Sequence, residues 1–234
     1  MEFDTIYDPM IQACITTGNE NFDAFLGGGY EQGIITTLYG PAASGKTTLC
    51  MLATIAMARE NKKVIYIDTE GGFSITRFEQ LGGMDVLDRV LLISPTTFSE
   101  QHNVIKSLYE LMNNSIAGII VDTISMQYRL ALSQSKTKKE INDCLGEQIS
   151  KLTNIARKFQ VPVIITNQVY SDFDLRDQVR MVGGDLLLYG SKCLIELEKK
   201  LNHRIAKIKK HRFIQENKNF VFSIIEEGIE EKQQ

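Results

Sequence analysis

The stretch IITTLYGPAASGKTT, residues 34–48, decides the fold of this chain. Its first six residues are apolar, β-branched or aromatic, which is typical of a buried strand. The next nine follow the spacing G-x-x-x-x-G-K-[ST], in which a glycine-rich loop leads into a helix and its backbone N–H groups surround phosphate oxygens. The stretch therefore predicts an α/β domain with a nucleotide-phosphate site where the strand ends.

Each part of this loop has an expected role. Gly40 and Gly45 allow the tight wrap, Lys46 can reach the β- and γ-phosphates, and the Thr47 hydroxyl is placed to coordinate Mg²⁺. The predicted cofactors are therefore ATP and Mg²⁺. The predicted nucleotide contacts cover the whole loop: Gly40, Pro41, Ala42, Ala43, Ser44, Gly45, Lys46, Thr47 and Thr48.

Short apolar runs alternate with helix-like stretches along the rest of the chain. The runs are VIYID (64–68), VLLIS (90–94), GIIVD (118–122) and VPVIITN (161–167), and the helical candidates lie around 74–82, 99–114 and 140–159. Alternation of this kind, with near-continuous apolar strands, predicts a mostly parallel sheet that helices cover on both faces.

The pattern changes after Gly183-Gly184. Three alternating runs follow with little room for helices, which predicts antiparallel strands that extend the sheet: CLIELEKK, HRIAKIKKHRF and FVFSIIEE. The polar stretches 129–141 and 169–184 are long enough to be functional loops. We expect one domain over residues 1–234, with a lead-in at 1–14 and a flexible tail at 229–234.

Composition limits the functional classes. The chain has 234 residues, 43% of them hydrophobic, and a formal net charge of −3, so any contact with nucleic acid must come from local basic clusters. Its four cysteines include no C-x-x-C pair, which argues against a disulfide framework or a zinc site. We find no secretory signal and no apolar run long enough for a bilayer, so we expect a soluble cytoplasmic protein without a membrane partner.

Acidic and amide side chains follow the predicted strands. Asp122 ends GIIVD and Asp68 ends VIYID, and we favour Asp122 as the acidic anchor for the metal beside Thr47. Glu70 is then free to position or deprotonate a water that attacks the γ-phosphate. Gln168 follows VIITN at a strand's carboxyl end, where ligands bind in open α/β sheets. The catalytic candidates are Glu70, Lys46 and Gln168.

Several motifs in order resemble the RecA-type recombinases. ITTGNENFDAFLGGGYEQGIITTLYGPAASGKTT resembles the approach to their phosphate loop, and YIDTEGGF resembles the segment with their catalytic glutamate, here Glu70. VIITNQV is similar to the strand before their sensing glutamine, and VGGDLLLYGSKCLIELEK to the segment after their second DNA loop. The resemblance covers residues from about 15 to 228 and implies a RecA-like ATPase core.

Departures from that pattern narrow the resemblance. The recombinases carry a helix-hairpin-helix domain and a Phe-x-x-Ala polymerisation hook ahead of the core, and neither motif occurs before residue 15 here. FSITR replaces their FRPER segment, which leaves Arg77 aligned with the arginine that stacks on adenine and puts Ser74 in place of the other arginine.

A core-only chain of this kind resembles the archaeal RadB group. The resemblance implies an ATP- and DNA-binding accessory of homologous recombination and repair, with weak hydrolysis and little strand exchange. The partners that it implies are single-stranded or branched DNA, the RadA recombinase or a junction resolvase, and a second copy in a homodimer.

Two clusters of cations are DNA candidates. The segment 199–212, KKLNHRIAKIKKHR, contains Lys207, Lys209, Lys210, His211 and Arg212, and its KHR element is similar to one in RadB proteins. It could equally be an edge strand that lysines protect from aggregation, or reach a neighbouring subunit's nucleotide. The second cluster lies in the first polar stretch and comprises Arg129, Lys136, Lys138 and Lys139.

Two other functions stay open from the sequence. A KaiC-like signalling ATPase or autokinase would share the phosphate loop and the sheet and would bind no DNA. A catalytically idle adaptor would act only through its interfaces. The basic segments speak against the first alternative, and the presence of Lys46, Thr47, Glu70 and Asp122 together speaks against the second.

Overall fold

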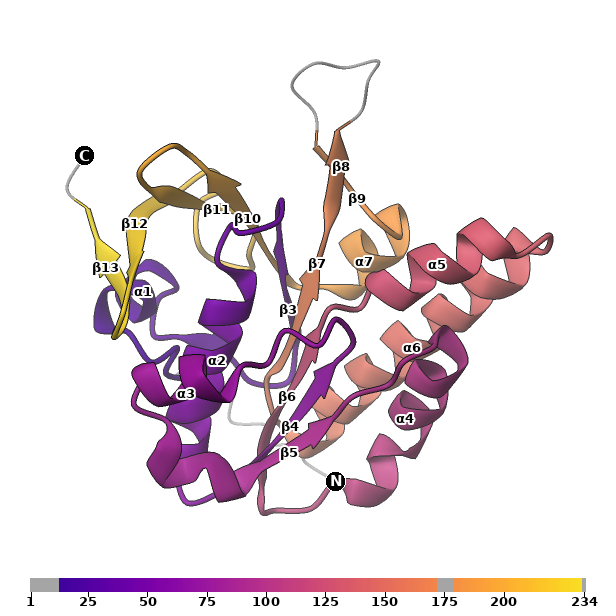
Figure 1. Cartoon of the computed structure of the whole chain (residues 1–234), viewed down its shortest axis with the longest axis horizontal. Coiled ribbons are helices and arrows are strands. Elements are labelled where there is room, and N and C mark those ends of the chain that lie inside the picture. Colours follow the sequence, from indigo (N-terminus) through magenta and orange to yellow (C-terminus); the bar gives the residue numbers. More distant parts are fainter. Residues whose placement is uncertain (1–12, 172–178, 233–234) are drawn as a thin grey trace, which may run out of the picture.

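Five strands that the sequence predicts lie side by side and parallel at one end of a nine-stranded sheet (Figure 1). The computed structural model describes residues 13–171 and 179–232. The strand order across the sheet is β13-β12-β11-β10-β3-β7-β6-β4-β5. The five predicted strands are β3 (Ile35–Tyr39), β4 (Lys63–Asp68), β5 (Val90–Ile93), β6 (Ile116–Asp122) and β7 (Val163–Asn167). The predicted α/β fold is confirmed.

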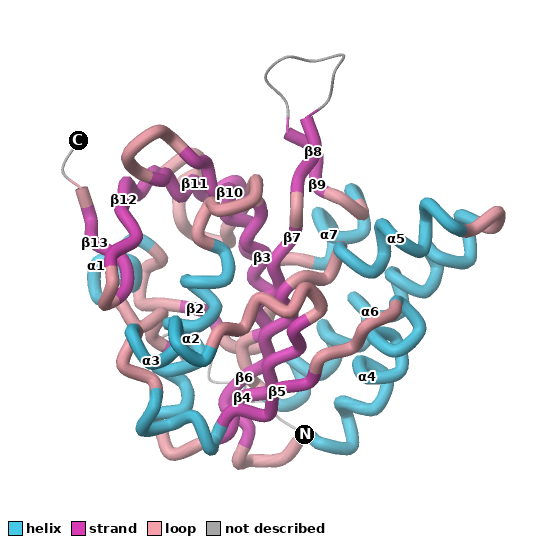
Figure 2. Tube along the Cα trace, in the orientation of Figure 1, coloured by secondary structure: helices cyan, strands magenta, loops and turns pink. Residues whose placement is uncertain are grey.

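Helices cover both faces of this sheet (Figure 2). On one face α1 (Glu20–Phe25), α2 (Lys46–Arg59) and α3 (Ile75–Gln80) pack into one apolar cluster with alternate strand residues. The other face is covered by α4 (Phe98–Leu111), α5 (Met126–Gln134), α6 (Lys138–Phe159) and α7 (Gly184–Gly190), which form a second cluster. A strand that is buried on both faces has no solvent-exposed face, which explains why its sequence is continuously apolar.

The carboxyl-terminal strands extend the sheet beyond β3. β10 (Cys193–Lys199) is parallel to β3, and β11 (Arg204–Lys210), β12 (Asn219–Ile225) and β13 (Gly228–Glu231) follow as antiparallel neighbours. Two short pairs lie outside the main sheet: β1 (Cys14–Ile15) with β2 (Tyr30–Glu31), and β8 (Val169–Ser171) with β9 (Val179–Met181). A 3₁₀ turn, η1 (Met84–Arg89), precedes β5.

Two local expectations were wrong, and the predicted antiparallel pairing of the carboxyl-terminal runs is confirmed among those runs but does not extend to their junction with β3. The polar stretch 129–141 is not one loop, because α5 continues to Gln134 and α6 begins at Lys138. The buried Tyr128 ring packs in the second apolar cluster and holds α5 against the sheet, which polarity alone does not reveal. Residues 229–231 are not a flexible tail, since they pair with β12. The first of the three carboxyl-terminal runs is parallel to β3, because it follows the crossover through α7.

The second polar stretch forms the β8–β9 hairpin, which projects at the same side of the sheet as the turn between β10 and β11 (Figure 1). Residues 172–178 at its centre, and the lead-in at 1–12, lie outside the described residues. Within the described ranges, none of the helices has the length and apolar character needed to cross a membrane.

Candidate nucleotide and DNA site

The loop between β3 and α2 has a backbone that only particular residues can adopt. Gly45 has φ +102°, in the left-handed region that glycine enters freely. A Cβ on Gly40 would lie 2.2 Å from the Leu197 carbonyl oxygen of β10, so the loop passes too close to its neighbour for any side chain. Both glycines of the motif are therefore required by geometry.

The residues around this loop fit a bound triphosphate. α2 begins at Lys46, so the first N–H groups of that helix have no partner within it and point toward the loop. Ser44 Oγ is buried and has no hydrogen-bond partner among the described residues. The Thr47 side chain lies beside the segment after Glu70, with its Cγ2 3.9 Å and its Oγ1 4.0 Å from a Cβ built on Gly72.

Lys46 lies with its ammonium group against the loop. Its Nζ donates to the carbonyl oxygens of Gly40 and Pro41, each at 2.8 Å. Burial lowers the pKa of Lys46, and the negative charges of Asp122 and Glu70 oppose that shift. A partly buried cation between a phosphate loop and two acids is placed to exchange its carbonyl partners for phosphate oxygens.

The two candidate metal anchors have different surroundings. Both oxygens of Asp68 accept backbone N–H groups, with Oδ1 bound to Glu70 and Gly72 and Oδ2 to Phe73 at distances of 2.9 to 3.2 Å. Asp68 therefore shapes the loop that carries Glu70. Asp122 accepts one hydroxyl on each oxygen, which leaves each oxygen a further acceptor position.

No group of three or more His, Cys, Asp or Glu in the described ranges could hold a metal ion alone. Mg²⁺ in nucleotide sites takes one or two protein ligands and fills the rest of its shell with phosphates and water. The pairing of Thr47 with Asp122 fits that use of the ion.

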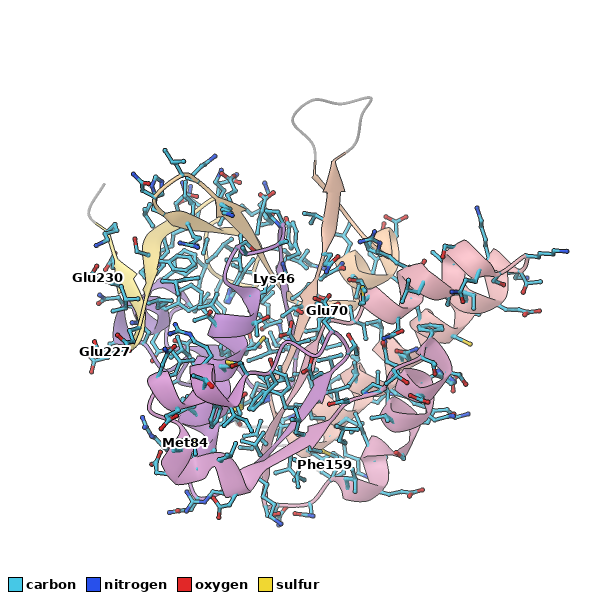
Figure 3. The ribbon with its side chains drawn as sticks, in the orientation of Figure 1. Lys46, Glu70, Met84, Phe159, Glu227 and Glu230 are labelled. Atoms are coloured by element: carbon cyan, nitrogen blue, oxygen red, sulfur yellow. The ribbon has the colours of Figure 1, made fainter. Side chains whose placement is uncertain are left out.

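Glu70 lies in the loop after β4 and Gln168 directly follows β7, and the two side chains meet across the end of β6, which lies between those strands. Gln168 Nε2 donates to Glu70 Oε1 at 2.7 Å, and the Thr123 hydroxyl donates to the same oxygen at 2.9 Å. Figure 3 shows Glu70 near the same end of the sheet as Lys46. The structure thus brings the three predicted catalytic residues, Lys46, Glu70 and Gln168, to one end of the sheet.

Arg129 of α5 extends this network toward solvent. Its Nη1 donates to Gln168 Oε1 at 3.0 Å, so the Gln168 amide bridges an arginine and the Glu70 carboxylate. A pocket of about 610 Å³ opens beside it, lined by Met126, Arg129, Leu130, Leu132, Ser133, Lys138 and Gln168. The candidate nucleotide site and one candidate DNA cluster are therefore physically connected.

Comparison with known proteins assigns the chain to a family. The Rad51 family profile matches residues 10–232. The chain belongs to the Rad51 family.

Within the Rad51 family, the chain is similar to proteins named "DNA repair and recombination protein RadB". The protein from Methanobrevibacter smithii is 38% identical over 223 residues, covering 90% of this chain and 93% of the relative. The protein from Methanoculleus marisnigri is 40% identical over 221 residues, covering 92% and 96%. The solved structure titled "Crystal structure of the RadB recombinase" superposes with a TM-score of 0.78 at 37% identity and covers 94% of this chain and 100% of its own. The RadB resemblance is confirmed.

Arg77, the predicted adenine contact of this Rad51-family chain, lies against the turn between β12 and β13. Its guanidinium donates to the Ile225 and Glu226 carbonyl oxygens at 2.8 and 2.7 Å. Hydrogen bonds in the plane of the guanidinium leave its flat faces available, so these contacts are compatible with stacking on a base. They also tie α3 to the carboxyl-terminal strands.

The structure divides the cationic segment 199–212 of this Rad51-family chain between two locations. Lys207 and Lys209 pair with Glu198 and Glu196 of β10, the latter at 3.7 Å. They line a polar groove of about 610 Å³ that also includes Gly40 and Pro41 of the phosphate loop.

The other cations of this segment make structural contacts. Lys210 Nζ donates to the carbonyl oxygens of Leu188 and Ser191 at 2.7 and 2.8 Å, at the end of α7. Arg212 pairs with the buried Glu31 carboxylate at 2.7 Å. The backbone N–H groups of the two residues that follow Arg212 both lie 3.4 Å from His211 Nδ1. The segment is therefore not one continuous basic patch.

The cations of the other cluster, Arg129, Lys136, Lys138 and Lys139, are exposed. Lys136 lies in the connection between α5 and α6, and Lys138 and Lys139 begin α6, near Arg129 across the pocket. Sequence reasoning missed the hydroxyls that complete the site, those of Tyr66, Thr123 and Thr166. Two of them could have been found, because Tyr66 and Thr166 stand in strands on either side of Asp122.

Proposed function

We propose that this RadB-type chain is an ATP-, Mg²⁺- and DNA-binding accessory of homologous recombination and DNA repair. It hydrolyses ATP slowly and catalyses little strand exchange of its own. The hydrogen-bonded path from Arg129 through Gln168 to Glu70 carries the proposal, because it joins an exposed cation to the acid of the phosphate site. The printed names of the RadB relatives support the setting in recombination and repair.

Different residues of the chain have different roles in ATP hydrolysis. ATP bound with Mg²⁺ supplies the phosphoanhydride bond that is cleaved and a cation that neutralises its charge. Lys46 and the loop N–H groups hold the phosphates, and Thr47 and Asp122 hold the metal side. Glu70 orients a water and accepts its proton as the water oxygen attacks the γ-phosphorus.

The contacts of Glu70 favour a slow reaction. Its Oε1 already accepts from Thr123 and Gln168, so only the remaining acceptor positions are free to hold a water. Full catalysis requires the water, the cation and the phosphates to be placed together. A change at Gln168 therefore changes how Glu70 is held.

DNA reaches this network through Arg129. A phosphate that binds Arg129, together with Lys136, Lys138 and Lys139, competes with Gln168 Oε1 for the guanidinium. The Gln168 amide is then released or reoriented, and the position of Glu70 changes with it. By thermodynamic linkage, nucleotide binding also changes the affinity for DNA.

Lys207 and Lys209 remain a second candidate surface for DNA. The element Lys210, His211 and Arg212 is a weaker candidate, because these residues make contacts within the protein. The RadA recombinase, a junction resolvase and a second copy of the chain stay proposed partners on the RadB resemblance alone. A cytoplasmic location also stays a proposal, which the setting in DNA repair supports.

One experiment tests the function. ATP hydrolysis and binding to single-stranded and branched DNA are measured at two salt concentrations, with and without ATP·Mg²⁺. We expect slow hydrolysis that DNA alters, and DNA binding that weakens as salt rises. Arg129→Ala should abolish the effect of DNA on hydrolysis, and its rate without DNA should shift toward that of the DNA-bound wild type, because Gln168 has lost the same hydrogen bond in both.

Arg157→Ala is the matched control, because Arg157 is an exposed arginine in the last turn of α6, at the other end of that helix. It should behave as the wild type. DNA-independent phosphorylation of the protein itself, without DNA binding, would refute the proposal in favour of a signalling autokinase. An equal DNA response in Arg129→Ala and wild type would refute the coupling path.

A further inference from the structure

Two buried hydroxyls hold the Asp122 carboxylate from opposite sides. Tyr66 of β4 donates from its phenol oxygen to Asp122 Oδ2 at 2.9 Å. Thr166 of β7 donates from Oγ1 to Asp122 Oδ1 at 2.5 Å. The strand order β7-β6-β4 places one donor on each neighbouring strand of Asp122. All three side chains are nearly inaccessible to solvent.

These three residues face α2, which begins at the phosphate loop. Tyr66, Ile120 and Ile164 belong to the apolar cluster that includes α2. Alternation along a strand puts Asp122 on the same face as Ile120 and Thr166 on the same face as Ile164. The Asp122 carboxylate therefore points toward the start of α2, where its negative charge favours the protonated form of Lys46.

Both hydroxyls are fitted to act as permanent donors. Each hydroxyl has one proton, and in the structure it donates that proton to one oxygen of Asp122. Each carboxylate oxygen has two lone pairs, so one donor on each oxygen leaves one position on each for a metal ion or its bound water.

We propose that Tyr66 and Thr166 are positioning residues for the divalent cation of this site. They lock the rotamer of Asp122 so that its free acceptor positions point at the cation that Thr47 also contacts. Groups that orient a metal ligand in this way typically change metal affinity by about 10- to 100-fold when removed. The inference rests on the proposed ATP·Mg²⁺ site and assigns to two further residues the control of its cation affinity.

The test is a Mg²⁺ titration of the binding of a fluorescent ATP analogue to the full chain. Tyr66→Phe and Thr166→Val each remove one hydroxyl and little volume. We expect each to raise the Mg²⁺ concentration at half-saturation by about 10-fold. Thr166→Ser keeps the hydroxyl and should restore the wild-type midpoint. Binding of the analogue in EDTA should be the same in all four proteins.

Tyr30→Phe and Thr36→Val are the matched controls. Tyr30 is a buried tyrosine whose hydroxyl has no hydrogen-bond partner among the described residues, and Thr36 is a buried threonine of β3. Neither should move the midpoint. An unchanged midpoint in both Tyr66→Phe and Thr166→Val, or a loss of binding that is equal with Mg²⁺ and with EDTA, would overturn the inference. A wild type that shows no Mg²⁺-dependent binding at all would instead overturn the proposed function.

Discussion

Glu70 and Gln168, 98 residues apart in the chain, are joined by a hydrogen bond of 2.7 Å from the Gln168 amide nitrogen to Glu70 Oε1. This bond connects the loop after β4 to the end of β7, on either side of β6. Because Arg129 donates to the other end of the same amide, any ligand of Arg129 acts on Glu70 through one side chain. The predictions that follow separate nucleotide binding, hydrolysis, DNA binding and stability.

Lys46→Ala should abolish tight nucleotide binding. The variant lacks the ammonium group that lies against the loop carbonyls, and alanine has no charge that could neutralise phosphate. Binding of a fluorescent ATP analogue checks this expectation. Lys106→Ala, on the exposed face of α4, is the matched control and should bind like the wild type. Tight ATP binding by Lys46→Ala would show that the phosphate site is elsewhere.

Glu70→Gln should stop turnover and keep nucleotide binding. The amide preserves the size of the side chain and its contact with Thr123, but it cannot take a proton from water. A lost general base typically reduces the rate by about 10²- to 10⁴-fold. Phosphate release and analogue binding are measured on the same samples. Glu79→Gln on α3 serves as the control, and hydrolysis at the wild-type rate by Glu70→Gln would remove the acid from the mechanism.

The two cationic clusters should respond differently to mutation. Lys210→Ala and Arg212→Ala should lower the free energy of unfolding, for Arg212 by about 1–3 kcal/mol, because a buried carboxylate on Glu31 loses its cation. The triple variant Lys136→Ala, Lys138→Ala and Lys139→Ala should weaken DNA binding, flatten its salt dependence and leave stability unchanged. Denaturant unfolding and DNA-binding isotherms check both halves. The reverse pattern would place the DNA surface on β11.

Stability should fall as pH drops through the range where histidine titrates. Burial lowers the pKa of His211, and the positive charges of Arg212 and Lys218 lower it further. The unfolded chain then takes up a proton near the usual histidine value of about 6.5, before the folded chain does, so the unfolding free energy decreases below that pH. Melting temperatures at pH 7.5 and 5.5 should differ less for His211→Gln than for the wild type. An equal difference in the two proteins would contradict this origin.

Much of the fold and the centre of the site could be predicted from local pattern. The run 34–48 contains a strand, a turn and a helix start in consecutive residues, so its structure depends on neighbours in the chain. The strands of the parallel sheet are recognisable because burial on both faces makes them continuously apolar. α5 was missed because several of its polar residues are exposed, whereas its buried residues, Gln127 and Tyr128, find their partners elsewhere in the chain.

A phosphate loop on a parallel α/β sheet can be predicted from the sequence, because motif spacing and apolar runs are local properties. Which acids and cations act together depends on the folded arrangement of the chain. Asp68 and Asp122 end adjacent strands and are equivalent in the sequence pattern. In the structure, backbone N–H groups bind Asp68, whereas hydroxyls from the strands on either side of β6 bind Asp122. Likewise, the sequence pattern places Lys210 and Arg212 in one basic patch. In the structure, Lys210 donates to the Leu188 carbonyl oxygen and Arg212 pairs with Glu31, and both partners are distant in the sequence. The partners of a charged side chain depend on contacts between residues far apart in sequence, which no local pattern contains.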